Sequence, residues 1–406
     1  VYNLFHRYTF SKNTTLENAL NFTYNWNDDR DEQNEEGTSY LYQNLNRNKT
    51  DIYKGNYTAV FGKSFGKSAL EIGNQLQYER MDLEQPSSVI PNNFTHSRWK
   101  EYLYADYTYN GNPFSFSTSL GWDLTFNEVE GKKKNYSRLK YSVSMDVNLG
   151  KNGGAKLFSR GYTVDPSSAY LNPYDTSADS LLIVRGNPSL TPYYYKEVGL
   201  TFSYSLGNLY IWPQLIYSHC SDMITAMGYY TDENIFVSTY GNTENEELLS
   251  ARAYLRYTFG KWGEISYTGS YNRNFYYTGV KEWFSHRINW NFRYKKVSLN
   301  GHVDTLSPSY TAIKKSKGSI ESQTTLNWNV SRQLSLRASI RYFVEGPKTS
   351  ESWIRQKDYY SYSRRVFDER HNMVMFGLSY RWQNKVKARK AKKLNVNDNR
   401  TSLLTE

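Results

Sequence analysis

The sequence has a single cysteine, Cys220, among its 406 residues. One cysteine excludes an intrachain disulfide and a cysteine-based zinc site, and we expect it to be a free, buried thiol. No apolar run approaches the roughly 18 residues of a membrane-spanning helix, so only strands could cross a bilayer. The chain also opens at Val1 without an initiator methionine or a signal segment. This predicts that a signal peptide was removed or that an N-terminal part is absent.

Hydrophobic residues are scarce as well. They make up 38% of the chain, and the mean hydropathy of -0.76 is close to that of a disordered protein. Aromatic residues nevertheless reach 17%, with 39 Tyr and 10 Trp, which disordered chains lack. The combination indicates apolar positions that alternate one-for-one with polar positions, as they do in strands with one polar face.

The segment 138–150, RLKYSVSMDVNLG, shows this alternation directly. Its two parities are Leu139, Tyr141, Val143, Met145, Val147 and Leu149 on one face, and Arg138, Lys140, Ser142, Ser144, Asp146 and Asn148 on the other. Successive side chains of a strand point to opposite faces, so the segment has one apolar and one polar face. The same template recurs in the segments 16–27, 114–127, 247–259, 284–294, 320–330, 334–344 and 372–382.

Strand length and loop pattern identify the medium that the apolar face meets. These segments are longer than the 5 to 6 residues that are most common in soluble strands, and they match the roughly 9 to 11 of a tilted transmembrane strand. Short turns alternate with long connections, as in outer-membrane barrels. The short turns predicted are 11–15, 110–113, 150–154, 207–208 and 331–333, and the long loops 28–39, 82–96, 165–190, 221–245 and 345–367.

The sequence therefore predicts an all-β fold, a transmembrane antiparallel β-barrel with about 17 strands, short periplasmic turns and long extracellular loops. The apolar parity of 138–150 is expected to face lipid and the polar parity a lumen. The aromatic residues near strand ends are expected to form interfacial girdles: Trp26, Trp122, Tyr193 to Tyr195, Trp328 and Trp382.

The strand count has a consequence for the chain ends. The last strand, 372–382, follows a long loop and ends on the short-turn side, so the first, 2–10, begins on the long-loop side. Bacterial single-chain barrels have even strand numbers and periplasmic termini. An odd count means that strands are missing before Val1 or that one strand is miscounted.

Two stretches resemble a known family. The stretch 162–192, YTVDPSSAYLNPYDTSADSLLIVRGNPSLTP, and the strand YYYKEVGLTFSYS after it are similar to the barrel domain of TonB-dependent receptor-like outer-membrane proteins. The end, HNMVMFGLSYRWQNKVKARKAKK, resembles that group's last strand and basic tail. The first match rests on Leu171, Asn172, Pro173, Gly186, Asn187, Pro188, Leu190, Pro192 and Glu197.

The resemblance implies an outer-membrane location in a Gram-negative cell and a 22-stranded barrel closed by an N-terminal plug. It also implies TonB-dependent uptake of a scarce nutrient ligand. The sequence has neither the plug nor the TonB-contacting box, and about 24 residues follow Trp382 where many barrels end on an aromatic residue. We expect a barrel domain at 1–383, with its N-terminal strands and plug missing, and a basic, disordered periplasmic tail at 384–406.

The formal charge of +11 is scattered through the alternating segments, apart from the run Lys385 to Lys393. We therefore expect no nucleic-acid partner, and lipid and lipopolysaccharide phosphates as the anionic partners. The TonB system, a surface lipoprotein and other outer-membrane subunits are the protein partners considered.

No catalytic centre, metal site or cofactor is predicted. Ser218 and His219 are strand neighbours that face opposite ways, and the other histidines are scattered. The acidic stretch Asp28 to Glu36 lacks the glycine and the ligand spacing of a calcium loop.

Ligand binding is expected in the long loops, which combine aromatic rings with polar groups. The candidates are Tyr170, Asn172, Tyr174, Asp175, Trp353, Tyr359, Tyr360 and Tyr362. Packing within the loops is the competing interpretation for each. Two other functions stay open: a structural or accessory barrel in a larger outer-membrane complex that does not transport, and a soluble all-β binding module.

Overall fold

The computed structural model describes residues 1–37, 40–85, 92–177, 182–243, 245–276, 279–310, 314–344, 349–356, 359–366 and 373–382. Within these ranges, the side chains of 31–46, 356 and 359 are not described. The proposed tail at 384–406 and its boundary at residue 383 therefore lie outside the described residues. No helix in the described ranges is long and apolar enough to span a membrane.

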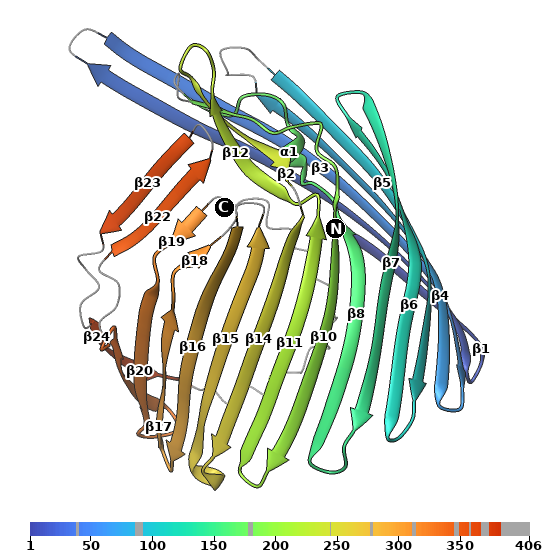
Figure 1. Ribbon diagram of the computed structural model, residues 1–406, viewed down its shortest axis with the longest axis vertical. Helices are drawn as coiled ribbons and strands as arrows, with labels where there is room; N and C mark the ends of the chain where they lie inside the picture. The colour runs from blue at the N-terminus through green and yellow to red at the C-terminus, as the bar shows by residue number, and fades with distance from the viewer. Residues whose placement is uncertain are drawn as a thin grey trace.

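Within these described ranges, seventeen strands form one antiparallel sheet, which agrees with the predicted number of about 17. In Figure 1 the sheet bends into a curved wall, with hairpin turns at its lower end and further small elements above. Each strand pairs with the next in sequence among β1 (Tyr2–Ser11), β2 (Thr14–Gly37), β3 (Tyr40–Phe65), β4 (Ser68–Gln85), β5 (Asn92–Asn110), β6 (Phe114–Val129), β7 (Lys132–Asn148), β8 (Gly153–Val164), β10 (Tyr193–Leu206), β11 (Leu209–Ser221), β14 (Glu246–Thr258), β15 (Gly263–Tyr276), β16 (Gly279–Tyr294), β17 (Val297–Leu306), β20 (Ser319–Asn329), β21 (Leu334–Arg341) and β24 (Met373–Tyr380).

The first and last strands run as the loop pattern predicts. β1 enters the short turn that leads to β2, and β24 runs back from the loop side toward the short-turn end. Among the described residues, no pairing joins β1 to β24, so each has one unpaired edge.

The predicted long loop 28–39 is wrong. β2 and β3 continue through it as a paired hairpin up to Gly37 and Tyr40, and the guanidinium of Arg47 holds the carboxylate of Asp28 with two hydrogen bonds of 2.8 and 2.6 Å. A hairpin that extends beyond the membrane has no apolar face to bury, so its polar sequence is compatible with pairing. The prediction of 82–96 as loop is wrong in part, because β4 continues to Gln85 and β5 begins at Asn92.

The other predicted loops contain secondary structure of their own. Helix α1 (Ser168–Leu171) and β9 (Leu182–Val184) follow β8, while β12 (Ile224–Tyr230) and β13 (Phe236–Asn242) follow β11. β9, β12 and β13 form a three-stranded sheet. The loops after β17 and β21 supply β18 (Ser309–Tyr310), β19 (Lys314–Ser316), β22 (Thr349–Gln356) and β23 (Tyr359–Val366), which form a four-stranded sheet.

Not every connection at the long-loop end of the sheet is long. β6 and β7 are joined by Glu130 and Gly131, which both have positive φ, 49° and 72°. This is the backbone twist that a two-residue hairpin turn prefers. At the opposite end, a 3-10 turn η1 (Gly260–Trp262) joins β14 to β15.

The outer face of the sheet carries the apolar parity. Leu139 and Met145 of β7 are 42% and 40% exposed, and directly paired positions on the neighbouring strands are also apolar, such as Trp122 and Phe116. On β5 this band runs from Trp99 to Tyr109, the span of about ten residues that a tilted strand needs. Of the residues predicted to form girdles, Trp26, Trp122, Trp328 and Trp382 are exposed, whereas Tyr193 to Tyr195 are only half-buried.

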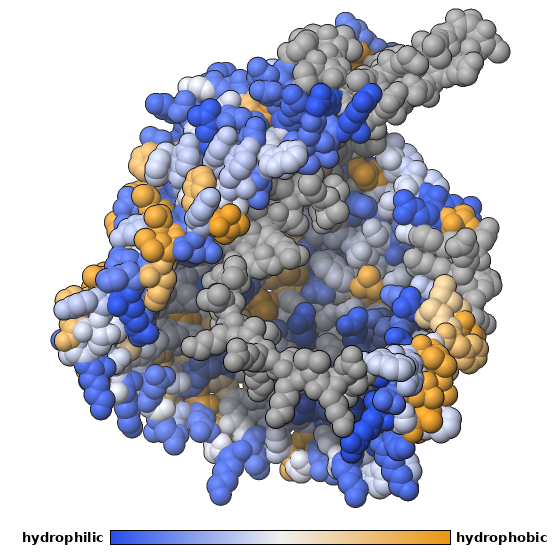
Figure 2. Space-filling view, turned by 180° about the vertical axis from the view of Figure 1, so that it is seen from behind, coloured by the Kyte–Doolittle hydropathy of each residue, from blue (hydrophilic) through white to orange (hydrophobic). Residues whose placement is uncertain are grey.

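The inner face carries the polar parity. Arg138 pairs directly with Asp123, and Asp123 is 4% exposed with its carboxylate 2.9 Å from the Lys100 ammonium. Seen from behind, the concave side of the wall is hollow, and hydrophilic residues line much of what is visible (Figure 2). The wall therefore separates an apolar exterior from a polar interior.

Candidate ligand-binding site

The residues 165–192 between β8 and β10, named here the β8–β10 loop, contain half of the predicted ligand residues. α1 opens at Ser167, whose hydroxyl accepts a hydrogen bond from the Tyr170 amide at 3.3 Å. Asn172 ends it, with its side-chain oxygen accepting from the Tyr174 amide at 3.1 Å. The carbonyl of Asn172 also accepts from the Gly186 amide at 2.6 Å. These local bonds give the resembling motif a defined shape.

Gly186 explains why a glycine stands in that motif. A Cβ atom at this position would collide with the backbone of Tyr170 and would lie 2.8 Å from the Asn172 nitrogen. The two arms of the loop, 170–172 and 186–187, can pack this closely only without a side chain there.

The loop is fixed to the inner wall of the sheet by polar contacts. The carboxylate of Asp165 lies 2.9 Å from the Lys100 ammonium, and the guanidinium of Arg98 donates to the Pro166 carbonyl at 3.5 Å. The imidazole of His96 lies with Nδ1 2.8 Å from the Ser168 hydroxyl and Nε2 2.6 Å from Asn127 Oδ1. All three anchors on the wall come from alternate, inward-facing positions of β5.

His96 is the most enclosed of these groups, with 0% of the residue exposed. It lies above the apolar band of β5, on the loop side of Trp99. Burial lowers the pKa of its imidazole below the ordinary value, and Arg98 lowers it further, whereas the hydrogen bond with Asn127 and the carboxylates of Glu79 and Asp165 raise it. Burial in this contact therefore disfavours the charged form of the ring.

A buried apolar cluster seals the same junction: Leu83, Phe94, Val129, Leu171 and Leu190. The first three belong to the upper ends of β4, β5 and β6, and the last two to the β8–β10 loop. The loop is therefore docked on the wall by both burial and charge.

The structure places Tyr170, Asn172, Tyr174 and Asp175 in the framework of this loop. The Tyr170 ring stacks on Tyr240 of β13 with centroids 4.0 Å apart, and the Tyr174 hydroxyl donates to Glu130 at 3.2 Å. Asp175 Oδ1 accepts from the amides of Ser177 and Val184, each at 2.9 Å. These side chains hold the loop to β13 and to the β6–β7 turn.

The second group lies on the hairpin of β22 and β23, whereas the first group lies in α1 and the segment after it; β12 contacts β23. The rings of Trp353 and Tyr362 are 5.6 Å apart, and Tyr360 and Tyr362 are 58% and 47% exposed. The side chain of Tyr359 lies outside the described residues.

Sequence reasoning missed the cations beside these rings. Lys315 and Arg355 lie over Trp353 and Tyr360, with distances to the ring centroids of 5.4 and 5.9 Å. The alternation of Glu351, Trp353 and Arg355 within 349–356 was the available signal, but the range had been assigned to a loop.

Other chemical sites are not built by the described residues. No group of three or more His, Cys, Asp and Glu in the described ranges is placed to hold a metal ion. β11 directs Ser218 and His219 to opposite faces, and the imidazole of His219 lies 3.7 Å from the Glu247 carboxylate of β14.

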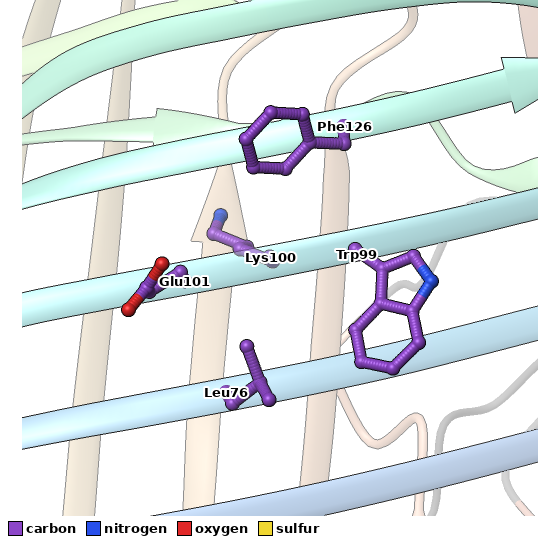
Figure 3. A pocket seen from close by; sticks show the side chains of 5 residues that line it. All are labelled: Leu76, Trp99, Lys100, Glu101 and Phe126. Atoms are coloured by element: carbon purple, nitrogen blue, oxygen red, sulfur yellow. The ribbon is translucent and has the colours of Figure 1, made fainter.

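A small pocket of 240 Å³ lies on the outer face, lined by Leu76, Trp99, Glu101, Phe126 and the stem of Lys100 (Figure 3). Glu101 accepts a hydrogen bond of 2.8 Å from Asn74 of β4. The figure shows Lys100 directed to the other side of the sheet from the remaining four residues. This pocket therefore opens toward the lipid and is separate from the loop site.

An apolar exterior, a polar interior and loops packed over one end define a transmembrane β-barrel protein. The sequence matches the outer membrane protein beta-barrel family over residues 3–380, and the chain belongs to that family. Its location is accordingly the bacterial outer membrane. No curated protein matches the sequence.

Solved structures with the same fold are receptors and transporters. The copper transporter OprC matches with a TM-score of 0.66 and 8% identity over 84% of this chain and 58% of its own. The ferric-catecholate import receptor Fiu of E. coli K12 matches with 0.60 and 10% identity, over 93% and 63%. The iron transporter FrpB of Neisseria meningitidis gives 0.59 and 10%, over 90% and 60%. The chain thus spans about three fifths of each of these proteins.

Proposed function

We propose that this chain forms the barrel of a TonB-dependent receptor that takes up a scarce nutrient ligand across the outer membrane. The observation that carries the proposal is the docked β8–β10 loop. It lies over the mouth of a wall whose fold is shared with import receptors, and it is held by Asp165 and Ser168 against Lys100 and His96. A loop fixed in this way gives the entrance of the lumen a defined shape for ligand binding.

The two groups of candidate residues are given different roles in this proposal. Tyr170, Asn172, Tyr174 and Asp175 position the loop, because their polar atoms and rings are engaged within it and with its neighbours. Trp353, Tyr359, Tyr360 and Tyr362 supply ligand contacts, since Tyr360 and Tyr362 are exposed and the Trp353 ring lies beside that of Tyr362. The TonB system would act through a plug encoded upstream of Val1.

The test uses the product of the whole gene, purified in detergent, and the purified periplasmic domain of TonB from the same cell. We expect the two to bind in surface plasmon resonance, and we expect deletion of the segment upstream of Val1 to abolish that binding while the barrel stays folded. A folded, full-length product that does not bind the TonB domain would refute the proposal and favour an accessory barrel.

A further inference from the structure

The four-stranded sheet of β18, β19, β22 and β23 has two chemically different faces. Pairing places Tyr310, Lys315, Trp353 and Tyr362 in one row across the four strands, and places Arg355 opposite Tyr360 in the next row. Directly paired residues, and residues two apart on a strand, share a face. One face, named here the basic aromatic face, therefore consists of Tyr310, Lys315, Glu351, Trp353, Arg355, Tyr360, Tyr362 and Arg364.

The opposite face is formed largely of small hydroxyl side chains: Ser309, Ser316, Ser350, Ser352, Ser361 and Ser363. Lys314, Ile354 and Arg365 also belong to this face, so the contrast lies in the aromatic rings Tyr310, Trp353, Tyr360 and Tyr362, which share the other face. The sheet is attached to the barrel at its first strand, where the Tyr276 hydroxyl of β15 donates to the Tyr310 carbonyl at 3.0 Å and Lys281 of β16 lies over the Tyr310 ring.

Two cations of the basic aromatic face lack an anionic partner. Glu351 lies 3.6 Å from Lys317 and 3.9 Å from Arg364, so its charge is shared by these two. Among the described residues, neither Lys315 nor Arg355 has a carboxylate within ion-pair distance, and both are exposed. Each lies over a ring instead, which restrains the cation while its remaining N–H groups stay available.

The spacing of these cations selects a type of ligand. Lys315 pairs directly with Trp353, and Arg355 is two residues further along β22, so the two cations stand diagonally across the indole at roughly 7–8 Å between backbone positions. Lys315 lies over Trp353 and Arg355 over Tyr360, so a ligand that meets both cations where they lie extends across two rings. A molecule with two anionic groups on either side of a ring with an apolar face fits, because the ring then meets Trp353 and Tyr362 while its anions meet the cations.

We propose that the basic aromatic face binds an acidic oligosaccharide, in which carboxylates or sulfates meet Lys315 and Arg355 and the sugar rings pack on Trp353, Tyr360 and Tyr362. Single-stranded nucleic acid is the competing polyanion, because its bases also stack on aromatic rings, and it is an outcome of the test below. The inference rests on the proposed function in that it names the ligand class of the receptor.

The experiment measures binding of a fluorescently labelled oligogalacturonate to the full-length protein in detergent by fluorescence polarisation. We expect binding that weakens as salt is raised, and no binding of a neutral dextran oligosaccharide of the same length. Replacing both cations, Lys315→Gln with Arg355→Gln, should weaken binding about tenfold or more, since two charge-assisted contacts are lost.

Lys261→Gln is the matched control. Lys261 also lies over an aromatic ring, 5.5 Å from the Trp262 centroid, but in the η1 turn at the opposite end of the barrel. It should leave binding unchanged. The proposal is overturned if wild-type protein does not bind the probe, if the double variant binds as tightly as wild type, or if the neutral dextran binds equally well.

Two further binding measurements distinguish the acidic oligosaccharide from other anionic ligands. Tighter binding of oligo(dT) than of the oligogalacturonate would indicate that the face binds nucleic acid rather than an acidic sugar. Displacement of the probe by equimolar purified lipopolysaccharide would indicate that the face binds the phosphates of the membrane itself. Because TonB is absent from this assay, binding that persists when the TonB interaction fails would refute import alone and leave the binding face in place.

Discussion

At the scale of single residues, the inner wall combines glycines with large rings. Tyr102 and Tyr104 of β5 stack with centroids 5.0 Å apart, and the Lys140 ammonium lies 4.2 Å from the centroid of Tyr102. The Tyr102 ring lies over Gly121 of β6 and the Tyr104 ring over Gly73 of β4. A ring placed over a strand glycine fills the space that the missing side chain leaves.

This packing makes Gly121 sensitive to a single methyl group. A Cβ atom there would collide with the Tyr102 ring and would lie 2.7 Å from the Leu103 carbonyl oxygen, so Gly121→Ala must displace the ring. We expect a loss of about 1–3 kcal/mol in unfolding free energy, measured by urea titration of the barrel refolded in lipid vesicles. Gly55→Ala on β3 is the control, since its nearest neighbour would be 3.9 Å away, and equal losses in both variants would contradict the explanation.

Cys220 gives a second prediction at this scale. The thiol lies near the loop end of β11 and is buried, as the sequence predicted, and burial raises its pKa to about 12. A thiol whose ordinary pKa is 9.0 would carry on the order of a thousandfold more thiolate at pH 8, and thiolate is the reactive form. We expect Cys220 to resist maleimide in the folded protein and to react fully in urea. Rapid labelling of the folded protein at pH 8 would show that the thiol is accessible.

At the scale of elements, much of the fold follows from alternation. The positions of β6 and β7 and the turns 110–113, 150–154, 207–208 and 331–333 were predicted because apolar and polar residues change parity there and Gly, Asn or Ser interrupts the pattern. The hairpin of β2 and β3 beyond Asp28 could not be predicted in the same way, because the sequence 28–39 contains no apolar residue and therefore no alternation.

The candidate site shows where this reasoning stops. The rings of the loops were found by composition, but their partners come from distant segments: Tyr170 meets Tyr240, and Trp353 meets Lys315. Such pairs depend on how loops fold over one another, and periodicity carries no information about that. The anchors His96 and Lys100 were missed because on β5 they are ordinary inward-facing polar residues.

Docking of the β8–β10 loop is expected to depend on pH through His96. Because the pKa of the docked imidazole is below its ordinary 6.5, protonation favours the undocked loop. The contribution of His96 to the free energy of docking is therefore fully present above about pH 6.5. It is lost as the pH falls from there through the lowered pKa. Hydrogen exchange of residues 166–176, corrected for the intrinsic effect of pH, should be faster at pH 5 than at pH 7.5.

His96→Gln provides the control for this effect, since an amide keeps hydrogen-bonding groups but does not titrate. Asn127 and Ser168 contact the ring, and Arg98, Glu79 and Asp165 also face it, so carboxylates contribute to any acid effect. The variant should lose the part of the pH dependence that belongs to the imidazole. If hydrogen exchange of the variant rises at pH 5 as much as that of wild type, the pH dependence comes from the carboxylates instead.

At the scale of the whole molecule, orientation follows from the two ends of the wall. Short turns such as 149–152 close one end, while the docked loop, the three-stranded sheet and the basic aromatic face crowd the other (Figure 1). Outer-membrane barrels direct their short turns to the periplasm. The groups that we propose to contact ligand are thereby placed on the cell surface, where both proposals need them.

Single cysteines on a Cys220→Ser background test this arrangement in whole cells. Asp232, exposed in the β12–β13 turn, should react with a maleimide too bulky to pass through porins, whereas Asn152 in the β7–β8 turn should react only after the outer membrane is permeabilised. Leu200, 51% exposed on the outer face of β10, should react with a lipid-soluble maleimide and resist a water-soluble one, because hydrocarbon surrounds it. Labelling of the cysteine at Asn152 but not of that at Asp232 in intact cells would show that the barrel has the opposite orientation in the membrane. Labelling of Leu200 by the water-soluble reagent would place that face in water, and the apolar columns of the wall would then need a protein partner to cover them.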